Sequence, residues 1–285
     1  MKFKPANKET VQKEPTPEEK FPFIFFEDAE VYHTKSKKGE VLSSHMLADF
    51  RKSPLLYHKK ITGEIPDKDS SAYLVGRATH SLILEGEEVF DTEYLVTDGP
   101  TNEKTGKAYG KDTKAYKAWL EEQDPAKQII STQDFALIET MNESVQNHPE
   151  AVKLLDDGVA EAVIRTEIDG HPCQIRMDWL HPKKGLVDLK TCDDLDWFTY
   201  DAKKYGYIHQ LAFYRSVIEA AADRVCPVWI IAVEKKEPFR TGVFKIIPGS
   251  LDDAAHENRA AIGELKKCFA TGIWPTGFEE VRPMY

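Results

Sequence analysis

Two carboxylates and an ammonium group, those of Asp178, Asp188 and Lys190, lie close together in a stretch that otherwise alternates as β-strands do. Side chains alternate between the two faces of a strand. If strands over 173–180 and 186–190 pair, the three charged groups can converge on one side of a sheet. Neighbouring carboxylates repel each other unless a cation lies between them, and Mg²⁺ favours carboxylate and carbonyl oxygens. The pattern is compatible with a hydrolytic site in which a lysine positions the attacking water.

This spacing does not establish such a site by itself. Taken alone, Asp188 and Lys190 are better interpreted as exposed strand residues in a surface ion pair that contributes little to stability. A histidine elsewhere changes this balance, because on a helix over 70–85 His80 shares a stripe with Arg77, away from the apolar stripe. A single histidine there is usually solvent-facing or satisfied locally. A neutral imidazole can also complete the coordination shell of a metal ion.

A second companion lies in the segment "YGYIHQLAFYRS". Gln210 and Tyr214 are four residues apart and therefore lie on one face of a helix. In the ordinary interpretation, Tyr214 packs in the core and Gln210 caps a nearby strand. In the functional interpretation, the same pair offers an amide and a hydroxyl to a phosphate or a base. Together with His80, this pair makes a functional site the favoured interpretation.

The remaining pattern predicts the elements that must position these residues. Residues 1–20 have the composition of a disordered tail. Residues 97–112 are predicted to form a long loop, and loops of this length are often functional. Strands are predicted over 21–26, 161–168, 172–180, 186–191, 227–234 and 240–247. Helices are predicted from Ser43 or Ser44 to Pro54 and over 70–85, 112–123, 131–147, 195–203, 206–221 and 250–270. This order indicates one α/β (α+β) domain over 21–285.

Bulk composition restricts the class of protein only loosely. The chain has 285 residues, a net charge of −10 and 41% hydrophobic residues, which is ordinary for a globular protein. No apolar run reaches the ~20 residues of a membrane-spanning helix, and the N-terminus has no signal-peptide pattern, so we expect a cytoplasmic protein without a membrane partner. The four scattered cysteines predict neither zinc nor an iron–sulfur cluster. The acidic charge lowers the odds of a nucleic-acid partner without excluding one.

Four motifs in this order resemble a known family. "GRATHSLIL", "RMDWL", "DLKT" and "QLAFY" are similar to the motifs of PD-(D/E)XK nucleases of the RecB-like branch, and most similar to those of phage RecE-type exonucleases (exonuclease VIII-like). The opening segment "LSSHMLADFRKSPLLYHKK" extends the resemblance to residues 40–285. The resemblance implies a restriction-endonuclease-like core, in which helices flank a central mixed β-sheet. The proline of the "PD" motif is absent, because Met177 precedes Asp178.

The resemblance also implies an activity, and with it partners and a location. The family members cut one strand of double-stranded DNA from its 5′ end. They require Mg²⁺, for which Mn²⁺ can substitute. They form ring-shaped homo-oligomers, so a trimer or tetramer is expected, together with a single-strand annealing protein (RecT-like) as partner. A phage- or prophage-encoded protein in a bacterial host is expected as well. An endonuclease, a flap-type nuclease and an inactive DNA-binding scaffold remain as alternatives.

The resemblance assigns roles by position. It implies that His80, Asp178 and Asp188 bind the metal, with the carbonyl of Leu189 as a further ligand. Lys190 matches the catalytic lysine, and Gln210 and Tyr214 match a motif near the active site. Glu161 is a candidate further acidic residue, with Glu167 as its competitor. Candidate DNA-binding residues are Arg77, which can grip a phosphate in a bidentate manner, Arg51 and Thr191, together with Lys104, Lys107, Lys111 and Lys114 of the long loop.

Overall fold

The computed structural model describes residues 16–66 and 71–284. The helices are α1 (Pro17–Lys20), α2 (Ala29–Lys37), α3 (Ser44–Lys52), α4 (Pro54–Ile61), α5 (Ser71–His80), the π-helical turn η1 (Ser81–Glu85), α6 (Glu87–Glu93), α7 (Lys114–Leu120), α8 (Thr132–Gln146), α9 (Pro149–Leu154), the 3₁₀ turn η2 (Leu195–Trp197), α10 (Phe198–Lys204), α11 (Tyr207–Ala222) and α12 (Pro248–Thr271). The strands are β1 (Tyr94–Val96), β2 (Gln128–Ile130), β3 (Val159–Ile168), β4 (His171–His181), β5 (Gly185–Cys192), β6 (Val228–Glu234) and β7 (Thr241–Lys245).

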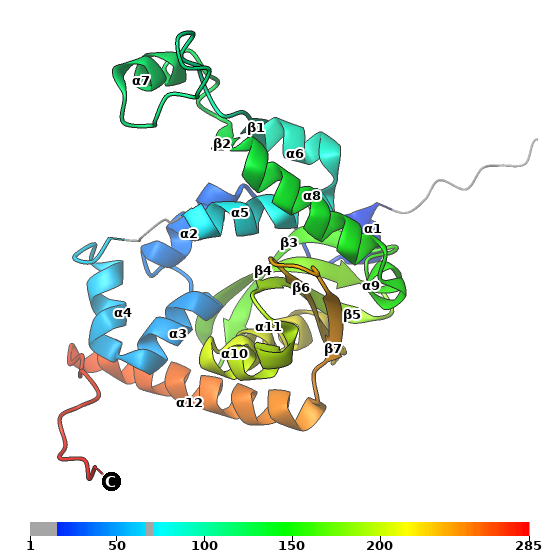
Figure 1. Ribbon diagram of the computed structural model, residues 1–285. Coiled ribbons are helices and arrows are strands. Elements are labelled where there is room, and N and C mark those ends of the chain that lie inside the picture. The colour runs from blue at the N-terminus through cyan, green and yellow to red at the C-terminus, as the bar shows by residue number, and fades with distance from the viewer. Residues whose placement is uncertain (1–15, 67–70, 285) are drawn as a thin grey trace, which may run out of the picture.

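A mixed five-stranded sheet in the order β3-β4-β5-β6-β7 forms the centre of the protein. Neighbouring strands are antiparallel except β5 and β6, which are parallel and are connected through α10 and α11. In Figure 1, α5 and α8 lie above the sheet, whereas α3, α10, α11 and α12 lie below it. Each layer encloses its own apolar cluster. The predicted central mixed sheet flanked by helices is therefore confirmed.

Local sequence explains where the first helices begin and end. The Ser43 hydroxyl accepts a hydrogen bond from the Met46 amide and caps α3. Ser53 ends α3 in an extended conformation and caps α4 in turn, because its hydroxyl accepts a hydrogen bond from Leu56. Pro54 occupies the first turn of α4, where its missing N–H costs nothing. The predicted break at Pro54 is thus a junction between two helices.

Two tight turns set the register of β3, β4 and β5. Asp169 and Gly170 join β3 to β4 with φ angles of 50° and 72°, the left-handed pair that a two-residue hairpin requires. Gly185 begins β5 with a φ of 89°. A Cβ atom at Gly185 would lie 2.2 Å from the carbonyl oxygen of Pro227, because the chain that enters β6 passes directly beside it.

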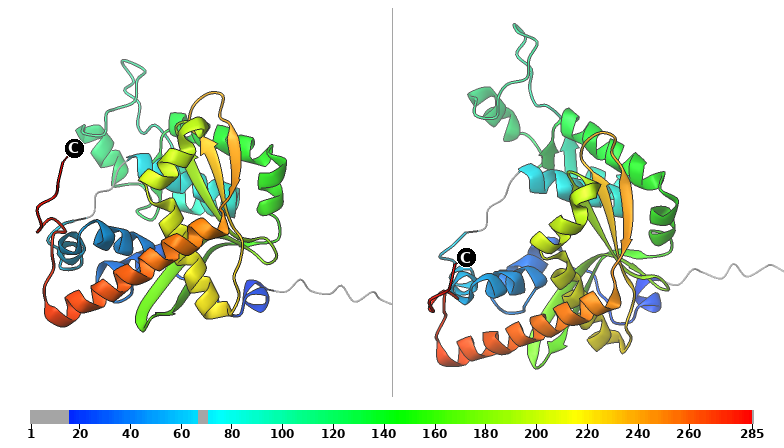
Figure 2. Two further views of the ribbon diagram at one scale, coloured as in Figure 1. Left: turned by 90° about the horizontal axis from the view of Figure 1, so that it is seen from below. Right: turned by 60° about the horizontal axis from the view of Figure 1, so that its bottom comes forward.

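An arm formed by residues 97–127 projects from the helical layer above the sheet. It leaves from β1 and returns through β2, and these two strands pair in parallel at its base. Figures 1 and 2 show the arm, with α7, extending away from the body in every view. Within the arm, the Tyr116 ring packs so closely on Gly99 that a Cβ there would lie 2.8 Å from it. The loop prediction for 97–112 is consistent with the arm, apart from one bridge between Thr101 and Ala108.

Several predictions for the N-terminal region were wrong or incomplete. Residues 21–26 form no strand: Phe25 makes one isolated bridge to Val163, while Phe21 and Ile24 pack in the core. Residues 1–15 of the predicted tail lie outside the described residues, but its last residues form α1, which a Thr16 capping box stabilises. The sequence pattern did not predict α2, α6, α9, β1 or β2. Among the described helices, none is both long and apolar enough to cross a membrane.

The turn at Gly185 generates a stability prediction. Replacing Gly185 by alanine forces a left-handed backbone onto an L-residue and places a methyl group against Pro227, so we expect a loss of roughly 2 kcal/mol or more in the free energy of unfolding. Gly263 is the matched control, because it lies inside α12 with open space around it. Gly263→Ala should stabilise the protein by up to about 1 kcal/mol. Urea denaturation of both variants measures the difference, and equal effects would contradict it.

Candidate functional site

The candidate site lies where β4 and β5 separate. Their ladder covers only the pairs Trp179–Val187, Leu180–Leu186 and His181–Gly185. Beyond the ladder, the Asp178 carboxylate replaces a backbone partner: its Oδ2 accepts a hydrogen bond of 2.8 Å from the Leu189 amide. β5 pairs with β6 along its whole remaining length and is therefore held in place from its other side. The gap between β4 and β5 is open to side chains from the surrounding elements.

Three potential metal ligands meet at this gap. One ligand atom from each of His80, Glu161 and Asp178 lies within 4.8 Å of the others. The His80 Nδ1 atom is 3.5 Å from Asp178 Oδ2, and the His80 and Asp178 side chains are 25% and 17% exposed. The three side chains come from α5, β3 and β4, so three separate elements contribute to the cluster. Partial exposure leaves room for water and a substrate to reach it.

Glu161 reaches the cluster through an unusual backbone conformation. Its φ is 55°, although it lies inside β3. Pairing resumes in the same register on both sides, from Ala160–Trp179 to Ala162–Met177, which places Glu161 opposite Asp178. A non-glycine residue with positive φ is uncommon and concentrates at functional sites. The competing Glu167 is exposed at the far end of β3, opposite Pro172.

His80 sits at a junction between two kinds of helix. It is the last residue of α5, and the π-helical turn η1 follows it directly. Turns of this type are rare and often occur at functional sites. Burial lowers the pKa of His80, although the Asp178 charge opposes this effect. A backbone contact with Leu189 also favours the protonated ring, which identifies the Leu189 carbonyl as the group facing the imidazole. At neutral pH the ring is therefore a neutral ligand.

Asp188 and Lys190 form a separate buried ion pair. Lys190 Nζ is 2.6 Å from Asp188 Oδ2, and the side chains are 16% and 1% exposed. Burial raises the pKa of Asp188, and the Asp178 charge adds to this effect. Burial alone would lower the pKa of Lys190, but the charges of Asp188 and Asp178 outweigh it and raise that pKa. Lys190 is accordingly an ammonium ion in this site.

Asp188 does not belong to the cluster of His80, Glu161 and Asp178 atoms, and its expected metal-binding role stays a prediction. Its carboxylate is turned toward Lys190 and is almost fully buried. Apart from that ion pair, no donor among residues 16–66 and 71–284 makes a hydrogen bond to either Asp188 oxygen. A buried carboxylate with so few partners is costly unless a further cation lies near it.

The charge balance of the cluster fits a divalent cation. Burial raises the pKa of Glu161 to about 8, because the Arg176 charge only partly offsets the desolvation and Asp178 adds repulsion. Arg176 Nε lies 2.5 Å from Glu161 Oε2. Two carboxylates, a neutral imidazole and a backbone carbonyl form a donor set rich in oxygen, which suits Mg²⁺ and Mn²⁺. A doubly charged ion would compensate the repulsion that the protein leaves in place.

Gln210 and Tyr214 are placed beside the same charges. Tyr214 is buried in α11, and its side chain forms a hydrogen bond with Gln210. Burial raises the pKa of Tyr214 well above its ordinary value, and the neighbouring Tyr32 and Asp178 raise it further. The hydroxyl therefore remains protonated, and Gln210, which is only partly buried, holds its orientation.

Three predicted DNA-binding residues lie outside this cluster. Arg77 is exposed one turn before His80, and its guanidinium donates a 3.0 Å hydrogen bond to Gln128 of β2. Arg51 contacts Asn258 of α12 at 3.4 Å, so the structure gives it a partner within the protein. Thr191 is partly buried in β5, one residue after Lys190. Of these three, Arg77 connects the site helix with the base of the arm.

Sequence reasoning missed three residues at the site. His45 of α3 lies near the charges of Lys190 and Asp178. Its pKa is lowered, mainly by desolvation and secondly by the Lys190 charge. Arg176 pairs with Glu161, and the Tyr207 ring lies 5.1 Å from Lys190 Nζ. Alternation along β4 already placed Arg176 on the face of Asp178. His45 and Tyr207 come from other elements, so no local pattern could associate them with Lys190.

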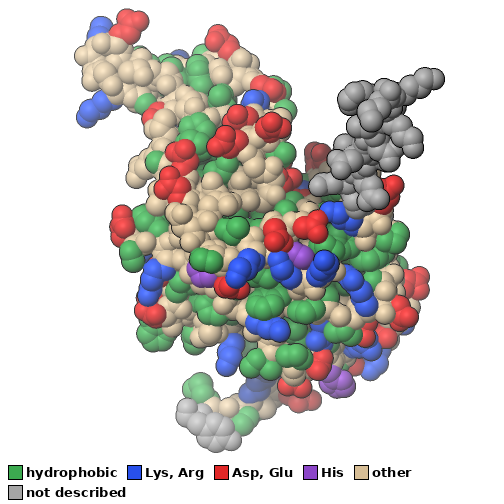
Figure 3. All heavy atoms as spheres, turned by 90° about the vertical axis from the view of Figure 1, so that its right-hand side faces the viewer, with side chains coloured by type: hydrophobic (Ala, Val, Ile, Leu, Met, Phe, Trp, Pro, Cys, Tyr) green, Lys and Arg blue, Asp and Glu red, His purple; other side chains and the backbone are tan. Residues whose placement is uncertain are grey.

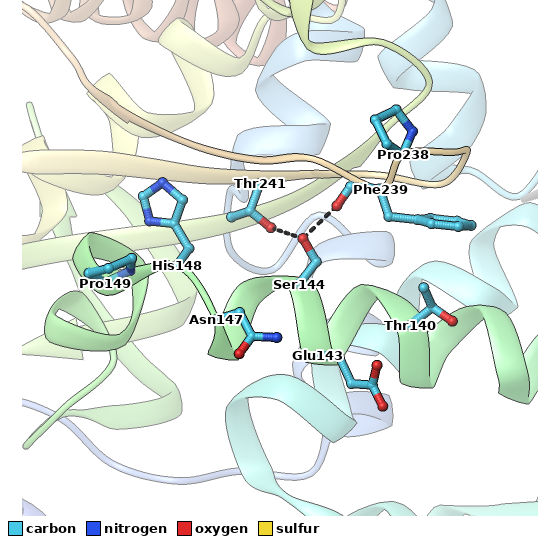
Figure 4. A pocket seen from close by; sticks show the side chains of 9 residues that line it. All are labelled: Thr140, Glu143, Ser144, Asn147, His148, Pro149, Pro238, Phe239 and Thr241. Atoms are coloured by element: carbon cyan, nitrogen blue, oxygen red, sulfur yellow. Dashed lines mark hydrogen bonds between the residues drawn. The ribbon is translucent and has the colours of Figure 1, made fainter.

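A cavity between α8 and the turn from β6 to β7 is not part of this site. It has a volume of about 420 Å³ (Figure 4). Ser144 of α8 connects two residues that line the cavity: it donates a hydrogen bond to the Phe239 carbonyl at 2.5 Å and contacts the Thr241 hydroxyl at 2.7 Å. None of the site residues lines it. The chemistry therefore belongs to the open strand gap rather than to this cavity.

The ligand cluster predicts binding of a divalent ion. Because His80 and Asp178 each offer an atom to the cluster, His80→Ala and Asp178→Asn should each weaken Mn²⁺ binding by at least about tenfold. Titration calorimetry, or the electron paramagnetic resonance signal of free Mn²⁺, measures the affinity. Glu257→Gln is the matched control, because Glu257 pairs with His209 at 2.8 Å but is outside the cluster. Unchanged Mn²⁺ affinity in both site variants would rule out this metal centre.

Comparison with known proteins is consistent with this geometry. The model of the family described as a PDDEXK-like domain of unknown function (DUF3799) matches residues 43–283. A crystal structure from Eubacterium rectale, named "Putative exonuclease", has a similar fold, with a TM-score of 0.65 and 18% sequence identity over 92% of this chain and 97% of that chain. The curated proteins give no match. The family match covers most of the chain, and the protein therefore belongs to the PDDEXK-like family and to the PD-(D/E)XK nuclease superfamily.

Proposed function

We propose that the protein is a Mg²⁺-dependent exodeoxyribonuclease that degrades one strand of double-stranded DNA from its 5′ end. The observation that carries this proposal is the ligand cluster of His80, Glu161 and Asp178 next to the Asp188–Lys190 ion pair. This combination of acidic ligands and an ammonium group is suited to hydrolysis of a phosphodiester. Mn²⁺ is expected to substitute for Mg²⁺, since the donor set includes an imidazole.

The side chains divide the work by charge. A divalent ion, when bound, supplies Lewis-acid activation of the phosphodiester and of the attacking water. His80, Glu161 and Asp178 would hold it, with the Leu189 carbonyl beside them. Lys190 faces the same gap as an ammonium ion, because its carboxylate neighbours raise its pKa. It would stabilise the negative charge that develops on the phosphoryl group. Asp188 orients that ammonium.

The polarity and the biological setting extend the proposal. Cleavage from the 5′ end would expose 3′ single strands for recombination by annealing, which requires a RecT-like annealing partner. A ring-shaped homo-oligomer, a trimer or tetramer, would keep an acidic protein on its DNA. These points rest on the motif resemblance to RecE-type exonucleases, whereas the fold shared with a protein named "Putative exonuclease" supports the nuclease activity alone. A phage- or prophage-encoded protein in the bacterial cytoplasm belongs to the same proposal.

The arm is a suitable surface for the DNA backbone. The basic part of the arm is residues 101–117, which carry five lysines and two acidic residues, whereas the whole arm, 97–127, carries six lysines and six acidic residues. The five lysines are Lys104, Lys107, Lys111, Lys114 and Lys117; all are exposed, and none forms an ion pair with another described residue. Figure 3 shows the arm above the body, with Lys and Arg as well as Asp and Glu side chains at its outer end. The Arg77–Gln128 hydrogen bond links its base to the helix of His80.

The catalytic proposal is tested with linear and covalently closed circular duplex DNA. We expect the protein to release nucleotides from the linear duplex only, and only with Mg²⁺ or Mn²⁺ present. Lys190→Ala should reduce the rate by about 100-fold or more. The fold should survive, because Asp188 already has a raised pKa and can take up a proton.

Circular dichroism and a thermal melt of Lys190→Ala provide the control for folding. Cleavage of the closed circle would favour an endonuclease, and cleavage at branched ends alone a flap-type nuclease. A wild-type protein that binds DNA without cleaving it would favour an inactive scaffold. Labelling either the 5′ or the 3′ end of the linear duplex determines the polarity directly.

Binding at different salt concentrations tests the arm. Replacing Lys107 and Lys111 by glutamine should reduce the slope of log Kd against log salt by up to about 0.9 for each lost phosphate contact. Lys38 and Lys183 are the matched control, since they are exposed lysines on the body of the protein. Fluorescence anisotropy with labelled duplex in Ca²⁺ measures both double variants. Equal slopes for the two would show that the arm does not contact DNA.

A further inference from the structure

A row of alternating cations and aromatic rings runs from the catalytic lysine to the surface. Lys190 Nζ lies 5.1 Å from the centre of the Tyr207 ring. The Tyr207 ring stacks on that of Tyr205, with their centres 5.9 Å apart and an angle of 30° between the planes. Lys204 Nζ lies 5.1 Å from the Tyr205 ring. The row is therefore continuous with the Asp188–Lys190 pair.

The two rings differ in how firmly the protein holds them. Tyr207 begins α11 and packs against buried Phe198, with ring centres 6.2 Å apart. Tyr205 is the C-cap residue that follows α10, and it is 59% exposed. Gly206 between them has a φ of 73°, the left-handed conformation that lets the chain reverse between the two helices. The reversal brings the rings of residues 205 and 207 into a stack. Tyr207 is thus an anchored ring, and Tyr205 is an outer ring without a packing role.

We propose that Tyr205, supported by Tyr207, is a stacking platform for an unpaired nucleobase next to the phosphodiester held at Lys190. This inference rests on the proposed nuclease function and adds how the strand is positioned. Aromatic side chains that follow a positively charged path are the usual means of binding single strands, because every base offers a π-face. An unpaired base is required, since the faces of paired bases inside a duplex are already stacked. The terminal base pair must therefore open before the strand enters the site.

The surroundings of the platform favour a nucleotide over other aromatic or apolar ligands. Lys190 contacts the Tyr207 ring and Lys204 the Tyr205 ring, so both ends of the row carry a cation that can pair with a phosphate of the strand. The cation–π contact of Lys204 is weak at an exposed site, so an arriving base can displace it toward the backbone. Stacking on a ring face does not read the hydrogen-bonding edge of a base. The platform should therefore bind all four bases with similar strength.

Fluorescence of 2-aminopurine tests the platform directly. An oligonucleotide with 2-aminopurine at its unpaired 5′ end is titrated with the full-length protein in Ca²⁺. We expect Tyr205→Ala to weaken binding by about 5- to 100-fold and to abolish the quenching that stacking causes. Tyr205→Phe keeps the ring and should retain both the quenching and the affinity within about twofold.

Tyr200→Ala is the matched control. Tyr200 lies five positions earlier in α10, is 61% exposed and is outside the ring row. The Tyr200→Ala variant should bind the oligonucleotide and quench the 2-aminopurine fluorescence as the wild type does. Equal losses from Tyr200→Ala and Tyr205→Ala would attribute the effect to the aromatic content of the segment and overturn the proposal.

An abasic nucleotide separates this inference from the proposed function. Removing the terminal base should weaken wild-type binding by the same factor as Tyr205→Ala, and it should have no further effect on that variant. If the abasic change weakens both proteins equally, the base does not stack on Tyr205. Cleavage of the intact oligonucleotide in Mg²⁺ is measured in parallel. Cleavage with no response to Tyr205→Ala overturns the platform alone, whereas an absence of both cleavage and DNA binding overturns the proposed function.

Discussion

The hydrogen bond from the Leu189 amide to the Asp178 carboxylate is the interaction on which the site depends. It replaces the backbone ladder where β4 and β5 separate, and thus lets the sheet open without leaving the amide unpaired. A carboxylate that accepts this hydrogen bond is fixed in position before any ligand arrives. The same separation allows His80 to approach from one layer and Lys190 to be reached from the other. Without it, paired strands would fill the place where the substrate must lie.

Burial of charge is the second constraint, and the structure resolves it only in part. Asp188 is compensated by Lys190, and Glu161 by Arg176. Both carboxyl groups nevertheless have raised pKa values, because burial and the neighbouring Asp178 outweigh the cations. The buried carboxyl groups therefore lower the stability of the fold, because the site has too little positive charge to compensate them. Residues selected only for stability would not be arranged in this way.

The sequence predicted the strands and the central charges because both depend on local patterns. Alternation along 173–190 brought attention to Asp178, Asp188 and Lys190. That alternation breaks at Asp178, where Met177 and Trp179 pack in different apolar clusters. Turn residues identified the hairpins. The sequence did not predict that Asp188 would be almost fully buried and paired with Lys190, since burial depends on tertiary packing. It also left Glu161 and Glu167 as alternatives, and the positive φ of Glu161 cannot be read from its neighbours. His45 and Tyr207 reach the site only through tertiary packing. The short segment 21–26 was mistaken for a strand because its packing in the core also depends on tertiary structure.

The π-helical turn after His80 also has a consequence for how the chain tolerates insertions and deletions. A π turn holds one residue more than an α turn, so the residues of this turn are out of α-helical phase with α5 before Gly86, with a φ of 87°, ends the helical run. Ser81, Leu82, Ile83 and Leu84 are consecutively buried, which a one-sided α-helix cannot achieve. Deleting one residue in this turn would restore α-helical phase without much shortening the helix. His80 and the apolar residues after it could then no longer face their partners at the same time, so the length of this segment is itself a functional constraint.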